Sequence, residues 1–440
     1  MKTWKVSLVI VMICAVLLLA FSNRKTRPVN KKPFVPPKGC VFRTVMGEES
    51  SDSGFIYKTP EKVQRAADRG LDWIARAQSK NGGWGAGSHD RQDVRDPHAV
   101  PTDPATTAMV AMAMLRSGTS LTEGVYAPQL RRALTHLLEA TEESPASSYN
   151  ITNLTSTQIQ VKLGANIDVI LTAQFLSNIL DHTTHDEALK ARVQRCLNLC
   201  VAKIQRAQDK NGSIAGSGWA GVLQSSFATN ALEAAQAQGA NVDDQALERA
   251  RDFQKKNYDT KTGDVNTDMG AGIMLYSVTG STRASAKEAR KVKEELARAK
   301  EDGRLSQSAP ATAENLEKLG YAKDEALKYS TAYEVYESAK VQSQRADVMD
   351  GFGNNGGEEF LSYLQTGESL IIGNDHSWKK WYDNVSGRLL NIQNNDGSWN
   401  GHHCITSPVF CTATCLLILS VNNDVEKLIE QGAEGKRSKN

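Results

Sequence analysis

Residues 351–360 combine flexible glycines, two amides and two adjacent acids in the order Gly-Phe-Gly-Asn-Asn-Gly-Gly-Glu-Glu-Phe. A carboxyl group near a binding site can transfer protons, so Glu358 and Glu359 are candidates for a general acid or base. The amides of Asn354 and Asn355 could bind a polar ligand such as a sugar. Two acids at the start of a helix also favour the helix dipole, which is the structural alternative for this pair.

Histidines and a cysteine form a second set of candidates, which suits a metal. His402, His403 and Cys404 follow Trp399 directly, and neutral imidazole and thiolate are ligands that zinc prefers. The long loop from residue 85 to 104 carries further polar groups, and loops of this length are often functional. Its candidates are His89 and His98 as metal ligands and Asp103 as a catalytic acid. Zinc is the one cofactor that these residues suggest, and solvated polar loops are the alternative.

Three gap-free repeats indicate which elements position these residues. The segments 78–84, 208–214 and 393–399 each have a glutamine, three polar residues, a glycine, one further residue and a large apolar residue. Each ends an amphipathic helix, and a loop and a second helix follow. The second helices are apolar on nearly every side, so we expect them inside the fold, at 105–115, 227–237 and 409–421.

The repeat extends over most of the chain with a period of roughly 45 residues. Residues 167–180 look like a further inner helix that has lost its turn motif. In another repeat, Asp268 occupies the position that corresponds to Glu358. We interpret Asp268 as a ligand-binding candidate, with a helix cap as the alternative. The highly charged stretch 283–328 predicts solvated outer helices.

The glutamine-x3-glycine-x-tryptophan segments resemble the core of the QW motif of squalene and hopene cyclases, whose repeat also occurs in protein prenyltransferase β subunits. The resemblance implies an all-α fold, a closed α/α toroid with inner and outer rings of helices, here over residues 59–431. In a closed ring the first and last repeats are neighbours. The loops after Trp84 and Trp399 would then lie at one end, where they could form a mixed histidine, cysteine and aspartate site.

The resemblance does not supply a reaction. The Asp-x-Asp-Asp acid of squalene-type cyclases is absent, with 242–244 (Val-Asp-Asp) as the nearest match, and the aspartate-x-cysteine zinc motif of prenyltransferases is not matched. We therefore expect a ligand-binding or scaffold toroid. The alternative is an enzyme, a metal-dependent hydrolase, lyase or transferase, that acts on a lipid or carbohydrate at the inner-helix end of the ring.

The N-terminal segment predicts that the body of the protein lies outside the cytoplasm. Residues 1–22 contain a basic start and an apolar run at 6–21, which reads as an uncleaved membrane anchor, with a cleaved signal peptide as the alternative. Residues 23–58 are proline-rich and polar, as in a flexible tether, and residues 432–440 form a polar tail. The body would lie on the extracytoplasmic side of the cell membrane, or would be secreted or periplasmic if the signal is cleaved.

The composition excludes collagen, extended disorder and a multi-span membrane protein for the bulk of the chain. The 440 residues are 40% hydrophobic and 23% charged, as in soluble globular domains. The net charge of +2, from 52 basic and 50 acidic residues, gives no support for nucleic-acid binding. A small molecule, lipid or carbohydrate is the expected ligand, and the sequence names no protein partner.

Overall fold

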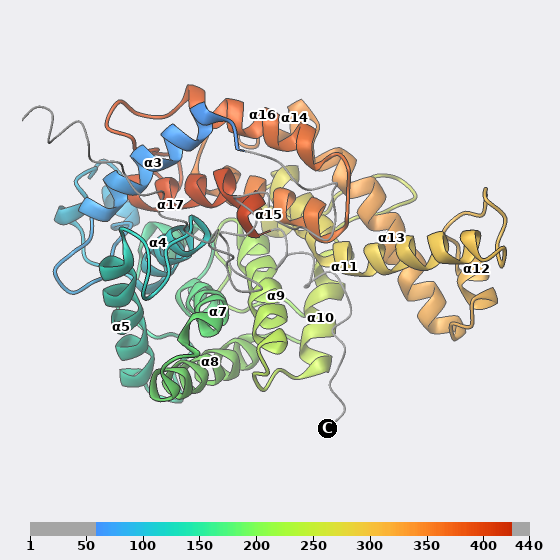
Figure 1. Ribbon diagram of the computed structural model, residues 1–440, viewed down its shortest axis with the longest axis horizontal. Coiled ribbons are helices and arrows are strands. Elements are labelled where there is room, and N and C mark those ends of the chain that lie inside the picture. Colours follow the sequence, from blue (N-terminus) through green and yellow to red (C-terminus); the bar gives the residue numbers. More distant parts are fainter. Residues whose placement is uncertain (1–58, 425–440) are drawn as a thin grey trace, which may run out of the picture. The chain divides into compact units, whose positions relative to one another are not determined.

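The computed structural model describes residues 59–424, and within them the chain forms two concentric rings of helices (Figure 1). The inner ring consists of α4 (Pro104–Arg116), α7 (Ile167–Ile179), α9 (Gly221–Ala237), α11 (Met274–Glu301), α15 (Gly357–Ile372) and α17 (Pro408–Leu419). The outer ring consists of α3 (Glu61–Arg76), α5 (Ala127–Glu143), α8 (Glu187–Ala207), α10 (Asp244–Lys255), α13 (Lys323–Ser343) and α16 (Trp378–Asn391). Three short helices lie in the connections: α6 (Gln158–Lys162), α12 (Ala313–Lys318) and α14 (Ala346–Met349).

The inner ring is closed. Each inner helix packs against the next one along the chain, and the last, α17, packs against the first, α4. This arrangement confirms the predicted all-α toroid. The N-terminal segments predicted at 1–22 and 23–58 and the tail at 432–440 lie outside the described residues. None of the helices between residues 59 and 424 is both long and apolar enough to cross a lipid bilayer.

Burial follows from the residue pattern of each ring. Every residue of α4 and of α17 is buried, because these helices meet neighbours on all sides. The outer helix α3 buries only one stripe, which includes Val63, Leu71 and Ile74, and exposes the charged opposite face. The predicted inner helices at 105–115, 227–237 and 409–421 and at 167–180 correspond to α4, α9, α17 and α7.

The glutamine of the repeat ties neighbouring outer helices together. Gln393 Nε2, after α16, donates to the carbonyl of Gly397 at 2.8 Å and to that of Ala66 on α3 at 2.9 Å. Arg69, one turn further along α3, donates to Gln393 Oε1. The last outer helix is thus fastened to the first, which closes the outer ring at the junction of the two ends of the fold.

The other two copies make the same contacts. Gln78 joins α3 to α5 through Gln129 O and Arg132, and Gln208 joins α8 to α10 through Ala246 O and Arg249. The tryptophans also have a shared role, since the indole N–H of Trp399 donates to Leu389 O at 2.8 Å in the preceding helix, as Trp84 does to Ile74 O. The motif is therefore a structural clamp at the end of an outer helix.

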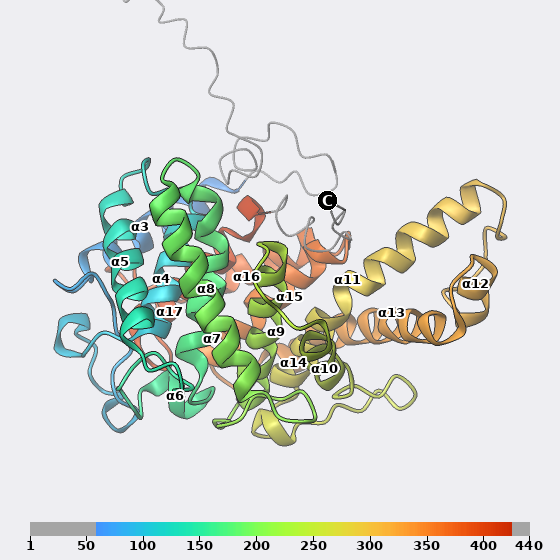
Figure 2. The same cartoon turned by 90° about the horizontal axis from the view of Figure 1, so that it is seen from below.

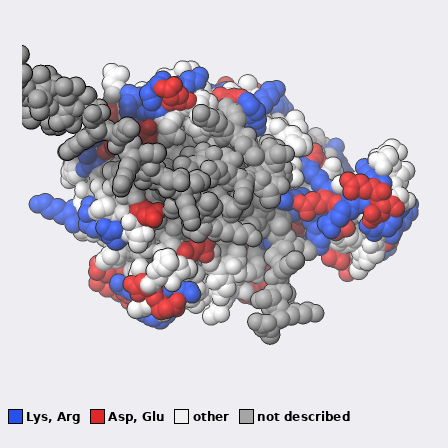
Figure 3. All heavy atoms as spheres, in the orientation of Figure 1, with Lys and Arg blue, Asp and Glu red and all other residues white. Residues whose placement is uncertain are grey.

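The charged stretch 283–328 departs from the prediction of solvated outer helices. Its first part belongs to the inner helix α11, where Arg283, Glu288 and Arg290 are buried. The rest of α11 runs beyond the ring and packs with α12 and α13 into an arm that has its own small apolar core (Figure 2). On this arm acidic and basic side chains intermix (Figure 3).

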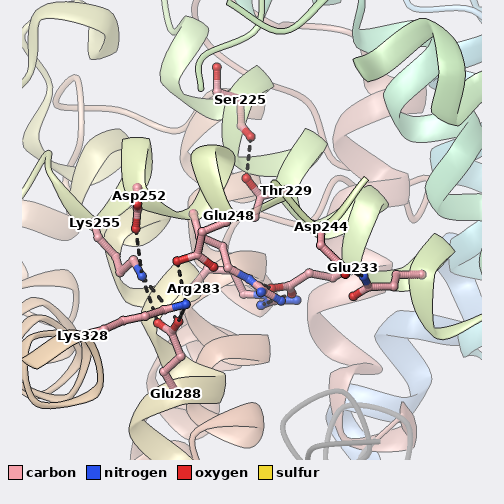
Figure 4. Close-up of polar contacts among 12 residues, drawn as sticks. Ser225, Thr229, Glu233, Asp244, Glu248, Asp252, Lys255, Arg283, Glu288 and Lys328 are labelled. Atoms are coloured by element: carbon pink, nitrogen blue, oxygen red, sulfur yellow. Dashed lines mark hydrogen bonds and ion pairs between the residues drawn. The ribbon is translucent and has the colours of Figure 1, made fainter. Parts of the chain in front are cut away.

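Ion pairs explain how charged side chains can be buried in the inner ring. Glu233 on α9 binds Arg251 on α10 at 2.7 Å and Arg283 on α11 at 2.9 Å (Figure 4). Burial opposes ionisation of Glu233, but the two arginines prevail and lower its pKa to about 2. Glu288 binds Lys255 of α10 at 3.1 Å in the same way. Glu233 and Glu288 thus each have a partner of opposite charge on a neighbouring helix, which a composition-based prediction does not detect.

Candidate functional site

Polar contacts join the first turns of the inner helices at one end of the ring, which we call the N-terminal mouth. At this end Ala105 N of α4 donates to Asp168 Oδ1 of α7 at 3.2 Å. Further around the ring, next to α4, Gly357 N of α15 donates to Ile405 O, just before α17, at 3.1 Å. Because helix starts expose free N–H groups, this end of a toroid is suited to carboxyl groups and anions.

Glu359 has a structural role in this mouth. It is fully buried, and its Oε1 accepts from Phe352 N at 3.1 Å and its Oε2 from Gly356 N at 2.9 Å. The Tyr276 hydroxyl of α11 also donates to Oε1. Burial, and next the charge of Glu359, raise the pKa of Tyr276, so the phenol keeps its proton and holds the carboxyl in place. These contacts cap α15 and join it to α11.

Glu358 differs from its neighbour because it has few partners. It is 2% exposed, and its Oε2 accepts from Ile405 N at 3.3 Å. The Cys404 thiol lies within hydrogen-bonding reach of the same carboxyl. Burial, followed by the negative charge of Glu359, raises the pKa of Glu358 to about 8. At neutral pH this side chain therefore carries a proton that it can donate.

In the loop before α17, Cys404 borders Glu358, and His403 Nε2 lies 3.7 Å from Glu359 Oε2. Cys404 is half-buried and has a left-handed backbone with φ of 58°. Burial and then Glu358 raise the pKa of its thiol to about 11, so it is a neutral thiol at pH 7. The His403 ring packs on Phe352 with 5.0 Å between centroids, and its Nε2 lies 2.9 Å from Asn354 O.

A buried lysine that the sequence analysis missed also belongs to this mouth. Lys162, at the end of α6, is 5% exposed, and its Nζ lies 4.3 Å from the ring centroid of Trp219. It lies close enough to Glu358 and Cys404 to lower the pKa of both. Gln158, one turn earlier, fixes the helix to the loop before α17, since its Oε1 accepts from Thr406 N at 2.8 Å and from Ser407 N at 3.1 Å.

Asp103, the third predicted catalytic acid, is the N-cap of α4. Its Oδ1 accepts from Thr106 N at 2.7 Å and its Oδ2 from Ala86 N at 2.8 Å, so it also anchors the loop after Trp84. Burial and the nearby Asp168 raise its pKa to about 7, and burial raises that of Asp168. The contacts of Asp103 are those of a structural cap.

The predicted meeting of the first and last loops is confirmed, but the predicted metal ligands do not meet. Thr406 joins the loops, because its hydroxyl donates to Gln92 O at 2.9 Å and its carbonyl accepts from Arg95. His402 and His98 are exposed, and His89 Nδ1 is paired with Gln92 at 2.7 Å. Within residues 59–424 no group of three or more histidine, cysteine or acidic side chains is placed to hold a metal ion. His402, His403, Cys404, His89 and His98 therefore do not form one zinc site here.

The predicted ligand-binding residues are on the surface. Asn354 is exposed and Asn355 half-buried beside His403, at the outer edge of the N-terminal mouth. The Asn355 carbonyl accepts from His402 N at 2.8 Å, which leaves its amide side chain for a ligand. Asp268 is an exposed residue of the short turn before α11, and the structure gives it no contact with Glu358.

The opposite end of the ring holds a small recess. It has a volume of about 40 Å³, room for roughly three water molecules. Arg116 lies in its wall and binds Glu368 at 2.7 Å and Asp424 at 2.7 Å. Because Glu368 and Asp424 already pair with the arginine, this charge cluster is satisfied within the fold, and we take the N-terminal mouth as the candidate site.

Comparisons with known proteins identify no relative from which an activity follows. No family model matches the sequence, and no curated protein matches it. Among solved structures, the fold is similar to a type II terpene cyclase, MstE from Scytonema. An arginine-to-alanine variant with its substrate geranylgeranyl dihydroxybenzoate has 12% identity and a TM-score of 0.45, covering 83% of this chain and 98% of that one. A ligand-free tyrosine-to-phenylalanine variant has 13% identity and a TM-score of 0.42, covering 83% and 97%.

Proposed function

We propose that this toroid is an enzyme that transfers a proton to a small ligand bound at the N-terminal mouth, with Glu358 as the general acid. The proposal depends on one observation, a buried carboxyl group with few partners beside a lysine and a thiol. Glu359, in contrast, is fully occupied by the cap of α15 and by Tyr276.

The protonation state of Glu358 suits this role. A general acid is most effective when its pKa lies near the working pH, and burial raises the pKa of Glu358 to about 8. After proton donation the carboxylate would face Lys162, whose positive charge stabilises it. The anion that forms therefore has a favourable partner, and the group can take up a proton again from solvent through the partly exposed Cys404 side of the loop.

A second candidate function is a toroid that binds the same ligand without converting it. The low exposure of Glu358 favours this reading, because a ligand must displace part of the covering loop to reach the carboxyl. The amides of Asn354 and Asn355 at the rim could contribute to binding in either case. Turnover, not binding, separates the two functions.

The experiment compares the wild-type chain with Glu358→Gln in a pooled extract of small metabolites, followed by mass spectrometry. Glutamine keeps the shape and the acceptor oxygen but cannot act as the acid. An enzyme predicts a substrate loss and a product gain with wild type that Glu358→Gln does not produce. The exposed Glu334→Gln serves as the control and should match wild type.

Retention of the same compound by both proteins, without any conversion, would contradict the proposed enzyme and support the binding toroid. Conversion at equal rates by wild type and Glu358→Gln would also exclude Glu358 as the acid.

A further inference from the structure

Three lysines are buried among residues 59–424, and two of them have evident partners. Lys203 is 2% exposed and donates to the carbonyls of Pro145 at 2.7 Å and Ser148 at 2.9 Å. Lys255 binds the carboxylate of Glu288 at 3.1 Å. Their burial is explained by structure alone, since each ammonium group has replaced its water with protein oxygen atoms.

Lys162 lacks such partners. At 5% exposure it has only the Trp219 ring within contact distance, and no carboxylate, carbonyl or hydroxyl of the described residues binds its ammonium group. A cation–π contact contributes on the order of 1 kcal/mol, less than the charge-assisted hydrogen bonds and the ion pair that hold Lys203 and Lys255. A folded chain keeps a poorly compensated charge most readily where it serves function.

The surroundings of Lys162 are those of a binding site. The ammonium lies at the N-terminal mouth, where Glu358 and Cys404 both sense its charge. The neighbouring Trp219 is 63% exposed, a large apolar surface left open at the rim. Backbone bonds hold the two residues together, because Trp219 N donates to Val161 O at 3.2 Å and Ala220 N to Lys162 O at 2.7 Å. The pair is therefore a fixed unit, open to solvent on the tryptophan side.

We propose that Lys162 and Trp219 form a recognition site for a ligand that carries a carboxylate group next to an apolar or planar body. The carboxylate would supply the oxygen atoms that Lys162 lacks, and the body would cover the exposed indole. A singly charged group fits better than a diphosphate, because the negative charge of Glu359 lies nearby and repels a second negative charge. This inference names the ligand class for the N-terminal mouth and rests on the proposed function for what happens to the ligand afterwards.

The first test needs no ligand. Lys162→Met removes a charge without partners, so the variant should have a thermal unfolding midpoint equal to or above that of wild type in a low-salt buffer. Lys203→Met is the matched control, and its midpoint should fall because buried carbonyl groups lose their donor. An equal fall in both variants would mean that Lys162 is structural and would overturn the proposal.

The second test uses matched probes, acetate and benzoate against the neutral acetamide and benzamide, at constant ionic strength. A ligand that binds the folded chain raises its unfolding midpoint in proportion to occupancy. At least one of the anions should raise the midpoint of wild type and of Lys203→Met, relative to each protein alone, and leave Lys162→Met unchanged. The amides should have no effect on any of the three.

An equal effect of the anions on wild type and Lys162→Met, or no effect on wild type up to saturating concentrations, would overturn the proposal. Lys162→Gln repeats the comparison if the methionine variant does not fold. These outcomes are independent of the result with Glu358→Gln. Anion binding at Lys162 without any turnover would refute the proposed enzyme but not this inference. Turnover that depends on Glu358, without any effect of the anions, would refute this inference but not the proposed enzyme.

Discussion

Lys162 and Glu358 lie near each other across the N-terminal mouth without forming an ion pair. The lysine lowers the pKa of the glutamate, yet burial and Glu359 outweigh it and keep the carboxyl neutral at pH 7. One residue comes from the short helix before α7 and the other from the first turn of α15. Closure of the ring brings these distant segments to the same opening, and with them a proton donor and an unpaired cation.

Stability should depend on pH through Glu358. Its pKa is about 8 in the folded chain and 4.5 ordinarily, so folding takes up a proton between these values. This contribution is fully present below pH 4.5 and is lost as the pH rises to about 8. Glu358→Gln cannot take up this proton, so its stability lacks this pH dependence. It should be more stable than wild type by about a few kcal/mol near pH 8 and differ little from wild type below pH 4.5.

Urea unfolding at a series of pH values measures this difference. The exposed Glu334→Gln should follow the wild-type curve throughout. A difference in the free energy of unfolding between Glu358→Gln and wild type that stays constant over the whole pH series would show that Glu358 ionises normally.

The repeat glycine can be tested with a matched pair of substitutions. Gly397 and Gly239 both have positive φ, 97° and 75°, where alanine costs about 1–2 kcal/mol. A Cβ at Gly397 would also lie 2.7 Å from the carbonyl oxygen of Arg69, whereas at Gly239 it would meet nothing within 4 Å. Gly397→Ala should therefore lower the free energy of unfolding clearly more than Gly239→Ala. Equal losses in chemical denaturation would mean that the clamp tolerates displacement.

At the opposite end of the ring, Arg116→Met should be strongly destabilising. The substitution leaves Glu368 and Asp424 without the cation that each binds at 2.7 Å, and loss of one member of a buried ion pair costs about 3–5 kcal/mol. Calorimetry at pH 7 measures the loss. The triple variant Arg116→Met, Glu368→Gln, Asp424→Asn should recover most of it, and failure to recover would show that the arginine acts by packing and not by charge.

The thiol of Cys404 reports on Glu358. Burial and Glu358 raise its pKa to about 11, so alkylation near pH 8 should be slow. Near pH 8 about half of the Glu358 carboxyl groups are ionised, so Glu358→Gln removes this negative charge and should speed the labelling of Cys404, as read by peptide mass mapping. Cys196, Cys200, Cys411 and Cys415 are buried and should stay unlabelled in both proteins. An unchanged Cys404 rate would place the two groups out of electrostatic contact.

The sequence predicted the ring because its pattern is local. The glutamine, glycine and tryptophan of 393–399 act through the ends of single helices, and the apolar run of α17 shows its burial directly. The inner helix α11 escaped prediction because Arg283 and Glu288 are buried by pairing with charges on other helices. Pairing over such distances leaves no signal in a local window.

Parts of the candidate site at the N-terminal mouth were also predicted where the sequence signal is local. Glu358 stood out beside a glycine-rich turn, and the meeting of the two loops followed from ring closure. Exposure of His402 and His98 depends on loop conformation, so their failure to meet as zinc ligands could not be foreseen. Lys162 gave no signal, because a lysine in a polar segment reads as solvated until the structure places Trp219 over it.

The central claim is that Glu358 holds a proton at neutral pH in the N-terminal mouth. The most direct measurement is a pH titration of glutamate side-chain carboxyl carbons by NMR, in which the resonance missing from Glu358→Gln identifies the group. A midpoint near 8 is the result that we predict. A midpoint near the ordinary 4.5 would contradict the account, because an ionised carboxylate at pH 7 has no proton to donate.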